Sequence, residues 1–262
     1  MYEHLNKFSS SYKSILLISA VLGLSACAHK NDNTMHDGET VINDPYENYN
    51  RKVMAFNQVV DKSVIYPSIR GYRTVVPAPA RTGIQNVLRN LGSPVTLANQ
   101  ILQGDFGGAH DAIIRAIVNT TIGLGGIFDV AGYEGIKYEQ EDFGQTLAVW
   151  GVDYGPYFVV PLLGPSSLRD YGGYFVDSMV DPLGWYLSNT DKTDIAAAKF
   201  SAGYLNIRDT LMDSQIDLSQ SSFDYYAAVR STYYQYRAAA IDDRSGTSLE
   251  TIPDIPDYDE YE

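Results

Sequence analysis

The clearest chemical signal in this sequence is a single cysteine near its N-terminus. Cys27 follows an apolar residue and two small residues in the run Leu24-Ser25-Ala26-Cys27. In bacterial lipoprotein signals the small residues admit the peptidase and the thiol accepts a diacylglycerol. Cys27 is the only cysteine of the chain, so it has no internal disulfide partner. We therefore expect Cys27 to carry lipid chains; the alternative is an ordinary secretory signal with an incidental cysteine.

The residues before Cys27 have the pattern of a cleaved signal. Lys7 and Lys13 supply positive charge, and residues 15–24 form an apolar run. That length suits the core of a signal peptide and is too short for a membrane-spanning helix. Ala28 follows the cysteine, whereas Asp at that position is associated with retention in the inner membrane. We therefore expect a signal peptide at 1–26 and a lipid-anchored protein on the periplasmic face of the outer membrane.

Residue types that could support catalysis are few and scattered. His110 is the only histidine after residue 36, and no G-x-S-x-G, H-E-x-x-H or cysteine cluster accompanies it. Ser166 and Ser167 are better explained as the N-cap of a helix. Four carboxylates within one region could act as acid and base, but each has a simpler structural explanation. A lipid hydrolase is the enzymatic alternative, yet we expect no catalytic residue, no metal and no cofactor. The four carboxylates are Asp142, Asp170, Asp177 and Asp181.

The charge balance excludes one large class of partners. The chain has a formal net charge of -13, and removal of residues 1–26 would delete two lysines and one glutamate and so leave -14. A chain this acidic should bind no nucleic acid and should avoid general electrostatic adhesion to anionic head groups. Membrane contact must then come from the anchor and from apolar and aromatic groups, including 21 tyrosines. Tyrosine favours membrane interfaces, although ordinary packing on helix faces is the alternative for any single one.

After the signal peptide the chain divides into three regions. Residues 27–43 are polar and aperiodic, which is typical of a flexible tether. Residues 44–241 carry helical periodicity without an alternating strand series, so the expected fold class is all-α. Residues 242–262 hold eight acidic residues and one basic residue, which indicates a disordered acidic tail.

Capping residues and helix breakers predict the limits of the helices. Asp44 is the expected N-cap of the first helix, with Pro45 in its first turn. A second helix should start near Ala80, break or kink at Gly92-Ser93-Pro94 and stop at Gly104. Further helices are expected from His110 to Thr121, from Ser166 to Asp181, over 191–213 and over 222–241. Thr190 or Asp191 is the expected cap of the helix at 191–213. An extended segment is expected at 157–160.

The segment 109–132 combines a narrow polar stripe with an apolar surface. Asp111, Arg115 and Asn119 lie four residues apart on one side of the expected helix, and isoleucine and valine occupy much of the rest. Three glycines then interrupt a second apolar stretch at 122–130. The segment is too short and too interrupted to cross a membrane twice. It is either a helical hairpin lying in one leaflet or a buried hairpin of a helical core, and the sequence leaves both alternatives open.

Several longer stretches are specific enough to identify relatives. They are D-P-Y-E-N-Y-N-R at 44–51, F-N at 56–57, P-A-P-A-R at 77–81, N-L-G-S-P at 90–94, L-Q-G-D at 102–105, N-T-T-I-G-L-G-G-I-F-D-V-A at 119–131, and the block at 141–173 that begins E-D-F-G-Q-T-L. With them the chain resembles the MlaA (VacJ) lipoprotein family of Gram-negative bacteria. The resemblance covers most of the region between Asp44 and about Arg237.

The resemblance implies a fold and a function. Members of that family are flat rings of amphipathic helices, embedded in the inner leaflet of the outer membrane around a central amphipathic pore. They associate with trimeric outer-membrane porins. They take mislocalised phospholipids from the outer leaflet and pass them toward a soluble periplasmic lipid-binding carrier, without covalent chemistry. The rival class is a porin-associated structural lipoprotein without lipid passage.

Apolar runs broken by three glycines make 119–131 our candidate segment for such a pore. The segment 119–131 should supply its polar lining, its apolar contacts and glycines that let it bend, with plain ring packing as the alternative for the apolar residues. Phe56 and Asn57 are a second candidate point, for regulation. The expected polar lining is Asn119, Thr120 and Thr121, the apolar contacts are Ile122, Leu124, Ile127 and Phe128, and the bending glycines are Gly123, Gly125 and Gly126.

Overall fold

The computed structural model describes residues 43–242. The expected signal peptide, the lipidated Cys27, the tether up to residue 42 and the acidic tail from residue 243 lie outside the described residues. Within 43–242 the structure is helical apart from one two-stranded sheet, which confirms the expected all-α class. The elements are α2 (Glu47–Val60), the π-helix η1 (Asp61–Ile65), α3 (Tyr66–Val75), α4 (Ala78–Leu102), α5 (Phe106–Thr121), α6 (Val130–Tyr133), α7 (Phe143–Val149), β1 (Tyr157–Val160), β2 (Gly164–Ser167), α8 (Leu168–Val180), α9 (Pro182–Asn189), α10 (Thr193–Ser221) and α11 (Tyr225–Asp242).

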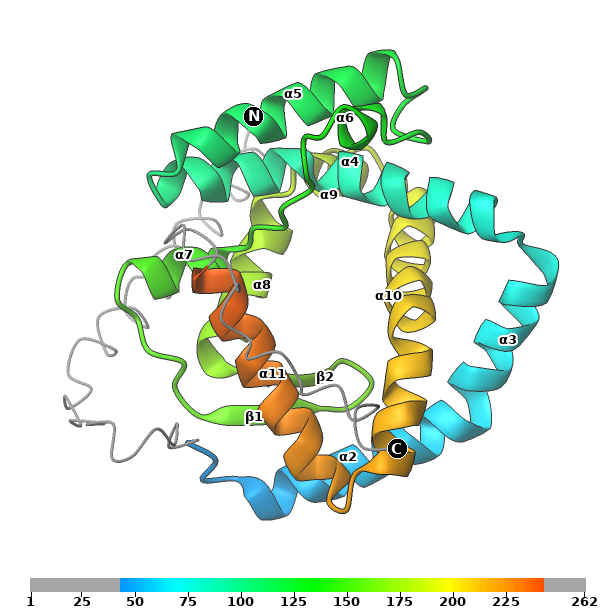
Figure 1. Ribbon diagram of the computed structural model, residues 1–262, viewed down its shortest axis with the longest axis vertical. Coiled ribbons are helices and arrows are strands. Elements are labelled where there is room, and N and C mark those ends of the chain that lie inside the picture. The colour runs from blue at the N-terminus through cyan, green and yellow to red at the C-terminus, as the bar shows by residue number, and fades with distance from the viewer. Residues whose placement is uncertain (1–42, 243–262) are drawn as a thin grey trace, which may run out of the picture. The chain divides into compact units, whose positions relative to one another are not determined.

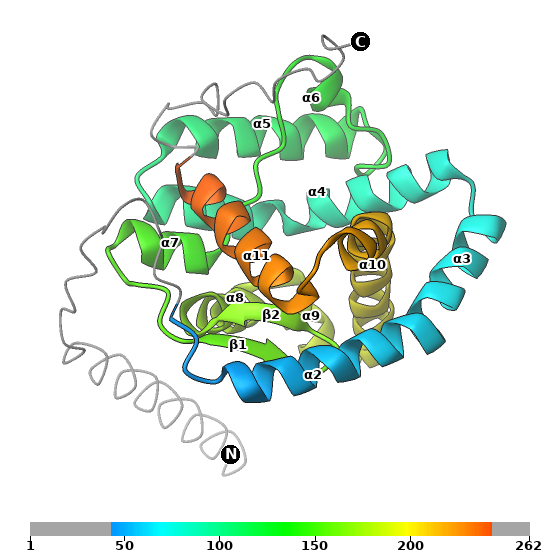
Figure 2. The ribbon, with the colours of Figure 1, turned by 60° about the horizontal axis from the view of Figure 1, so that its bottom comes forward.

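The elements of residues 43–242 follow one another around a closed ring (Figure 1). α2, η1 and α3 form one continuous helical arm, after which α4 carries the ring on to α7. α7 packs on α8, α8 packs on β2, and β1 returns to α2, so the ring closes. α10 lies inside the arm and contacts α3, α4 and α9, whereas α5 packs on the outer side of α4 (Figures 1 and 2). The closing contacts therefore join segments that are far apart in the sequence.

The start of α2 differs from the sequence prediction. α2 begins at Glu47, and no side chain caps it. The carboxylate of Asp44 instead accepts hydrogen bonds from the Asn50 amide (2.9 Å) and from Tyr226 and Arg230 of α11. The predicted N-cap is wrong because a nearly buried ion pair with α11 takes the carboxylate that would have capped the helix.

The predicted break in α4 and the predicted limits of α10 are wrong. α4 runs unbroken from Ala78 to Leu102 through Pro94. The missing amide of Pro94 removes one helical hydrogen bond, and the packing of α4 against α5, α7 and α10 offsets that loss. α10 extends beyond the predicted 191–213, and its N-cap is Lys192. Asp191 has a left-handed backbone (φ 55°) instead of the extended backbone typical of an N-cap.

The predicted serine cap and the end of α8 at Asp181 are confirmed, whereas the helix begins at Leu168 and Ser166 belongs to β2. Ser167 accepts a hydrogen bond from the amide of Asp170 (3.2 Å) and caps the helix. α8 ends directly before Asp181, whose carboxylate accepts from the amide of Leu183 (3.2 Å) and starts α9. The extended piece predicted at 157–160 is strand β1, which pairs with β2 in an antiparallel hairpin.

Two asparagine side chains of α2 close the ring at the free edge of β1. Asn50 donates to the carbonyl of Tyr157 (3.0 Å) and accepts from the amide of Val159 (2.9 Å). Asn57, two helical turns further on, donates to the carbonyl of Val160 (3.1 Å) and accepts from the amide two residues later (2.8 Å). Each side chain therefore satisfies backbone groups that a neighbouring strand would otherwise pair.

α11 fastens the ring across one face (Figure 2). Arg237 bonds the carboxylate of Asp142 (2.6 and 3.0 Å), at the start of α7, and that of Asp170 (3.1 Å) in α8. Tyr233 donates to Asp170 (2.5 Å), and Arg230 pairs with the carboxylate before α2 (2.6 Å). We call these bonds and those of the two α2 asparagines the closure contacts; they are made by Asn50, Asn57, Arg230, Tyr233 and Arg237.

Candidate functional site

The described residues show an inverted distribution of polarity. Buried polar and charged side chains outnumber buried apolar ones among them, and many large apolar side chains are exposed. α5 shows this most clearly. Arg115 and Asn119 are buried, whereas Phe106, Ile113 and Ile117 are 73%, 42% and 56% exposed. A helix on the surface of a water-soluble protein has the opposite arrangement, so the outward side of α5 is suited to apolar surroundings.

The buried polar groups of α5 hold the chain that follows the helix. The guanidinium of Arg115 bonds both carboxylate oxygens of Asp129 (2.8 and 2.9 Å). Asn119 donates to the same carboxylate (2.9 Å) and accepts from the amide of Ala131 (2.9 Å). Burial raises the pKa of Asp129, but the bonds from Arg115 and Asn119 outweigh it and leave the pKa below its ordinary value. We call these bonds the turn contacts.

The three nominated polar residues lie in different surroundings. Asn119 is 6% exposed and belongs to the turn contacts. The hydroxyl of Thr120 accepts from the side-chain amide of Asn90 in α4 (2.8 Å), and that of Thr121 donates to a carbonyl within α5 (2.7 Å). Because both threonines are exposed, they remain accessible to a ligand, whereas Asn119 positions the backbone after α5.

Residues 122–129 form a compact turn instead of the second arm of a helical hairpin. α5 ends before this turn, and only the one-turn helix α6 follows it. The backbone is left-handed at Leu124, Gly125 and Gly126 (φ 53°, 73° and 95°), which ends the helix. A bond from the amide of Gly126 to the carbonyl of Asn119 (2.7 Å) folds the chain back. The prediction of a helical hairpin is therefore wrong.

The four nominated apolar residues of this turn are exposed. Ile122 and Leu124 are each 66% exposed, Ile127 is 46% exposed and Phe128 is 53% exposed. They extend the apolar side of α5 beyond the end of the helix. We call the combined patch the α5 surface; it consists of Phe106, Ile113, Ile117, Ile122, Leu124, Ile127 and Phe128.

Two of the three nominated glycines are needed for close packing. A Cβ atom on Gly123 would lie 2.3 Å from the carbonyl oxygen of Phe128, and one on Gly126 would lie 2.6 Å from the Cβ of Asn90. Around Gly125 there is open space, but its positive φ favours glycine. The glycines therefore permit a tightly packed turn whose apolar side chains are exposed.

Two small cavities lie along the seam between α4 and α5. One of about 20 Å³ is lined by residues that include Gln100, Asp111 and Arg115, and a second of about 10 Å³ is lined by Asn90 and Asn119 among others. Each volume suits about one water molecule. Neither of these two cavities has room for a lipid head group.

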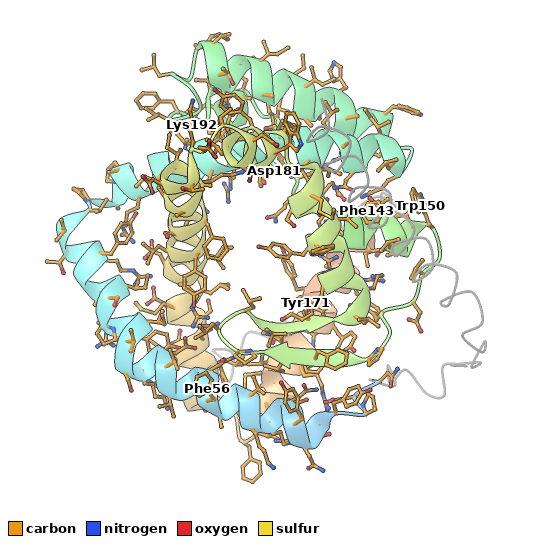
Figure 3. The ribbon with its side chains drawn as sticks, turned by 180° about the vertical axis from the view of Figure 1, so that it is seen from behind. Phe56, Phe143, Trp150, Tyr171, Asp181 and Lys192 are labelled. Carbon is orange, nitrogen blue, oxygen red and sulfur yellow. The ribbon has the colours of Figure 1, made fainter. Side chains whose placement is uncertain are left out.

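The second nominated point, Phe56 and Asn57, combines two opposite environments. Phe56 lies on α2 (Figure 3) and is 52% exposed. Asn57 is 7% exposed and makes two of the closure contacts. Of these two adjacent residues, Phe56 is therefore part of the exposed surface, and Asn57 helps to close the ring.

The carboxylates considered as catalysts are all engaged in structural contacts. Burial raises the pKa of Asp177. Burial also raises the pKa of Asp142, but the guanidinium of Arg237 outweighs this and holds it below its ordinary value. The partners are Arg237 for Asp142 and Asp170, Asn99 for Asp177, and Lys199 for Asp181. Asp181 lies directly before α9, and Lys192 lies shortly after it (Figure 3).

Other chemistry is equally sparse in the described part of the chain. The side chain of His110 is 72% exposed and contacts Asp111 (3.0 Å). Residues 43–242 contain no group of three or more potential metal ligands. In the same range no helix has the length and apolar character needed to cross a membrane.

Sequence reasoning missed the closure contacts made by Asn50 and by Arg237. A signal for Asn50 was present, because Asn50, Asn57 and Asp61 recur at spacings of seven and four along α2 and the start of η1, on the side that also carries Val53. Polar groups on an otherwise inward helix face indicate partners for buried backbone groups. No comparable local pattern identifies the partners of Arg237, which lie 95 and 67 residues away.

Comparison with known proteins gives a consistent result. The model of the MlaA lipoprotein family matches residues 42–240. The intermembrane phospholipid transport system lipoprotein MlaA of Escherichia coli is 37% identical over 196 residues, which cover 73% of this chain and 76% of that protein. The Haemophilus influenzae protein of the same name is 32% identical over 254 residues, covering 94% and 96% of the two chains.

A solved structure supports the same relationship. A chain from work on the structural basis for maintenance of bacterial outer membrane lipid asymmetry has a TM-score of 0.66 and 35% sequence identity to this protein. The match covers 76% of this chain and 98% of that chain. On the family match and these relatives, this chain belongs to the MlaA lipoprotein family.

Proposed function

We propose that this protein transports phospholipid between membranes and thereby maintains the lipid asymmetry of the outer membrane. The E. coli and H. influenzae relatives are named for intermembrane phospholipid transport. The similar solved structure concerns outer-membrane lipid asymmetry. The match to the family covers nearly all of the described residues, which supports transfer of the role of the relatives to this chain.

The inverted distribution of polarity is the observation that carries the proposal. Exposed apolar area is unfavourable in water by roughly 25 cal/mol per Å², and this term vanishes when the surface faces lipid. The α5 surface alone has seven outward apolar side chains, and the buried groups behind it, including Arg115 and Asn119, are hydrogen-bonded. An exposed apolar surface with hydrogen-bonded polar groups behind it suits the inner leaflet of the outer membrane, with lipid chains on Cys27 as the anchor.

The same polarity accounts for lipid passage. A phospholipid that changes leaflet must move a charged head group past hydrocarbon, which is costly unless polar groups or water shield it. In our proposal the centre of the ring provides an amphipathic pore for the head group. The acyl chains contact Ile122, Leu124, Ile127 and Phe128, and Thr120 and Thr121 offer hydroxyls next to them. Asn119 contributes indirectly by holding the turn in place.

The proposed lipid route involves two protein partners, one where the phospholipid enters and one where it leaves. The ring accepts mislocalised phospholipid from the outer leaflet while it is associated with a trimeric porin, and a soluble periplasmic carrier receives the lipid. No catalytic step is required, because the lipid leaves chemically unchanged. The partners follow from the family role, and the apolar outer surface and polar interior are compatible with it.

The direct test measures the phospholipid content of the outer leaflet in living cells. The readout is the palmitoylation of lipid A. A deletion strain would be complemented with the wild-type chain, with Cys27→Ala, and with Leu124→Ser/Phe128→Ser, whose folding would be checked by thermal unfolding. We expect deletion to raise the signal and only the wild-type chain to restore it fully. An unchanged signal after deletion would contradict the transport role and favour a structural lipoprotein. Full rescue by the double variant would remove the turn from the proposal.

A further inference from the structure

Positive charge is concentrated in one part of this acidic chain. Residues 48–104 contain a single carboxylate, that of Asp61, although the chain has a net charge of -13. The same stretch contains seven cations, so it is locally basic. They are Arg51, Lys52, Lys62, Arg70, Arg73, Arg81 and Arg89.

The cations that face the inside of the ring are neutralised. Arg73 and Arg81 both bond the carboxylate of Asp209 in α10 (2.5 and 2.7 Å). Arg51 bonds Asp224 between α10 and α11 (2.8 Å). These pairs hold the arm against α10 and α11 and leave little free charge on the inner side of the arm.

The outward cations of the arm have no such partner. Lys52, Lys62 and Arg70 are exposed on α2, η1 and α3. Among residues 43–242, none of the ion pairs within 4.0 Å involves these three side chains. From Lys52 to Arg70 the arm extends over roughly 27 Å at about 1.5 Å per residue. The arm runs along the outer edge of the ring (Figure 1), and these three exposed cations on it have no ion-pair partner within the described part of the chain.

Apolar side chains alternate with these cations. Phe56, Val59, Val64 and Val75 are 52%, 63%, 55% and 80% exposed on the same arm. At a membrane surface, apolar side chains enter the acyl region while long cationic side chains extend toward the phosphates. The mixed surface spans three helical segments and includes no exposed carboxylate.

We propose that this outer face of the arm, which we call the basic edge, binds anionic phospholipid head groups. It is defined by Lys52, Lys62 and Arg70 with Phe56, Val59, Val64 and Val75. The inference does not depend on lipid passage through the ring. The rest of the chain is acidic and repels an anionic surface, so the basic edge also orients the ring. An acidic protein would match the charges but not the interleaved apolar side chains.

The test is vesicle binding by the mature chain from residue 27 to 262, with Cys27→Ser so that the anchor does not dominate. Binding to vesicles of phosphatidylglycerol mixed with phosphatidylcholine would be compared with binding to phosphatidylcholine alone, at low and high salt. Lys62→Gln/Arg70→Gln removes two charges from the basic edge. The matched control, Lys137→Gln/Lys192→Gln, removes two exposed charges elsewhere.

Each cation near an anionic surface contributes about 1 kcal/mol. We therefore expect Lys62→Gln/Arg70→Gln to reduce the preference for anionic vesicles roughly 25-fold, and the control to change it at most a few-fold. Salt should weaken the wild-type preference. Equal effects of the two double variants, or no anionic preference in the wild-type chain, would overturn the proposal. Either result would leave the transport proposal standing, because lipid asymmetry in cells is measured separately.

Discussion

The closure contacts and the turn contacts use the same chemistry over different distances along the chain. In both, a buried arginine binds aspartate and an asparagine side chain binds backbone groups. The closure contacts of Arg237 and Asn50 span 95 and 107 residues, whereas those of Arg115 and Asn119 span 14 and 12. Buried polar contacts therefore stabilise the structure at two scales. The closure contacts stabilise the whole ring, and the turn contacts stabilise one local turn.

The difference implies different consequences of loss. A closure contact joins elements that lie far apart in the sequence, so its removal should destabilise the whole fold. A turn contact shapes a short segment behind the α5 surface, so its removal should loosen that segment while the ring remains folded. Stability measurements separate these two outcomes.

Replacement of Arg237 by alanine should have the largest effect. Arg237 is 7% exposed, and its loss leaves the carboxylates of Asp142 and Asp170 without their shared cation. Removal of one partner of a buried ion pair typically costs about 3–5 kcal/mol. We expect a loss of that order in the free energy of unfolding, measured with denaturant. Arg70→Ala, on the exposed side of α3, is the control and should stay within about 0.5 kcal/mol; similar losses for both would break the comparison.

Asn50→Ala should have the next largest effect. Asn50 is 0% exposed and makes two hydrogen bonds to β1, so the variant leaves a buried carbonyl and a buried amide without partners. We expect a loss of roughly 2–3 kcal/mol in the same measurement. The matched variant Asn86→Ala removes one exposed bond to the turn (3.2 Å) and should cost well under about 1 kcal/mol. Equal losses would mean that the edge of β1 does not depend on α2.

Gly123→Ala should perturb the turn more than the ring. The new methyl group would lie 2.3 Å from the carbonyl oxygen of Phe128, so the backbone of the turn must shift. Hydrogen exchange should become faster at amides 122–131, with a global loss of roughly 1–2 kcal/mol. Gly71→Ala, where nothing lies within 4 Å, should leave the turn unchanged and stabilise α3 by up to about 1 kcal/mol. Uniformly faster exchange in Gly123→Ala would show that the turn and the ring are one cooperative unit.

The smallest effect should come from pH. Arg237 holds the pKa of Asp142 below its ordinary value of 3.8, against the effect of burial. A carboxylate with a depressed folded pKa stabilises the protein above the unfolded pKa, and this contribution is lost as pH falls through the folded pKa. The stability difference between the wild-type chain and Asp142→Asn should therefore be present at neutral pH and shrink below 3.8. A difference that grows with acidification would contradict the pairing with Arg237.

The sequence predicted local features, such as helix caps and polar stripes, better than it predicted the closure contacts. The stripe of Asp111, Arg115 and Asn119 and the cap at Ser167 depend on neighbouring residues, so periodicity and capping rules find them. The partner of Asp44 lies in α11, and a single sequence contains no signal for that distance. The left-handed backbone at Leu124 was missed for another reason, since a non-glycine residue adopts it only when the surrounding turn enforces it.

The central claim is that the α5 surface faces phospholipid. A photocrosslinking amino acid at Phe128, which is 53% exposed, would be compared in living cells with one at Gln235, an exposed position of α11. We expect phospholipid adducts at position 128 and none at position 235, as detected by mass spectrometry of the purified protein. Adducts at both positions to the same extent, or none at position 128, would contradict the account.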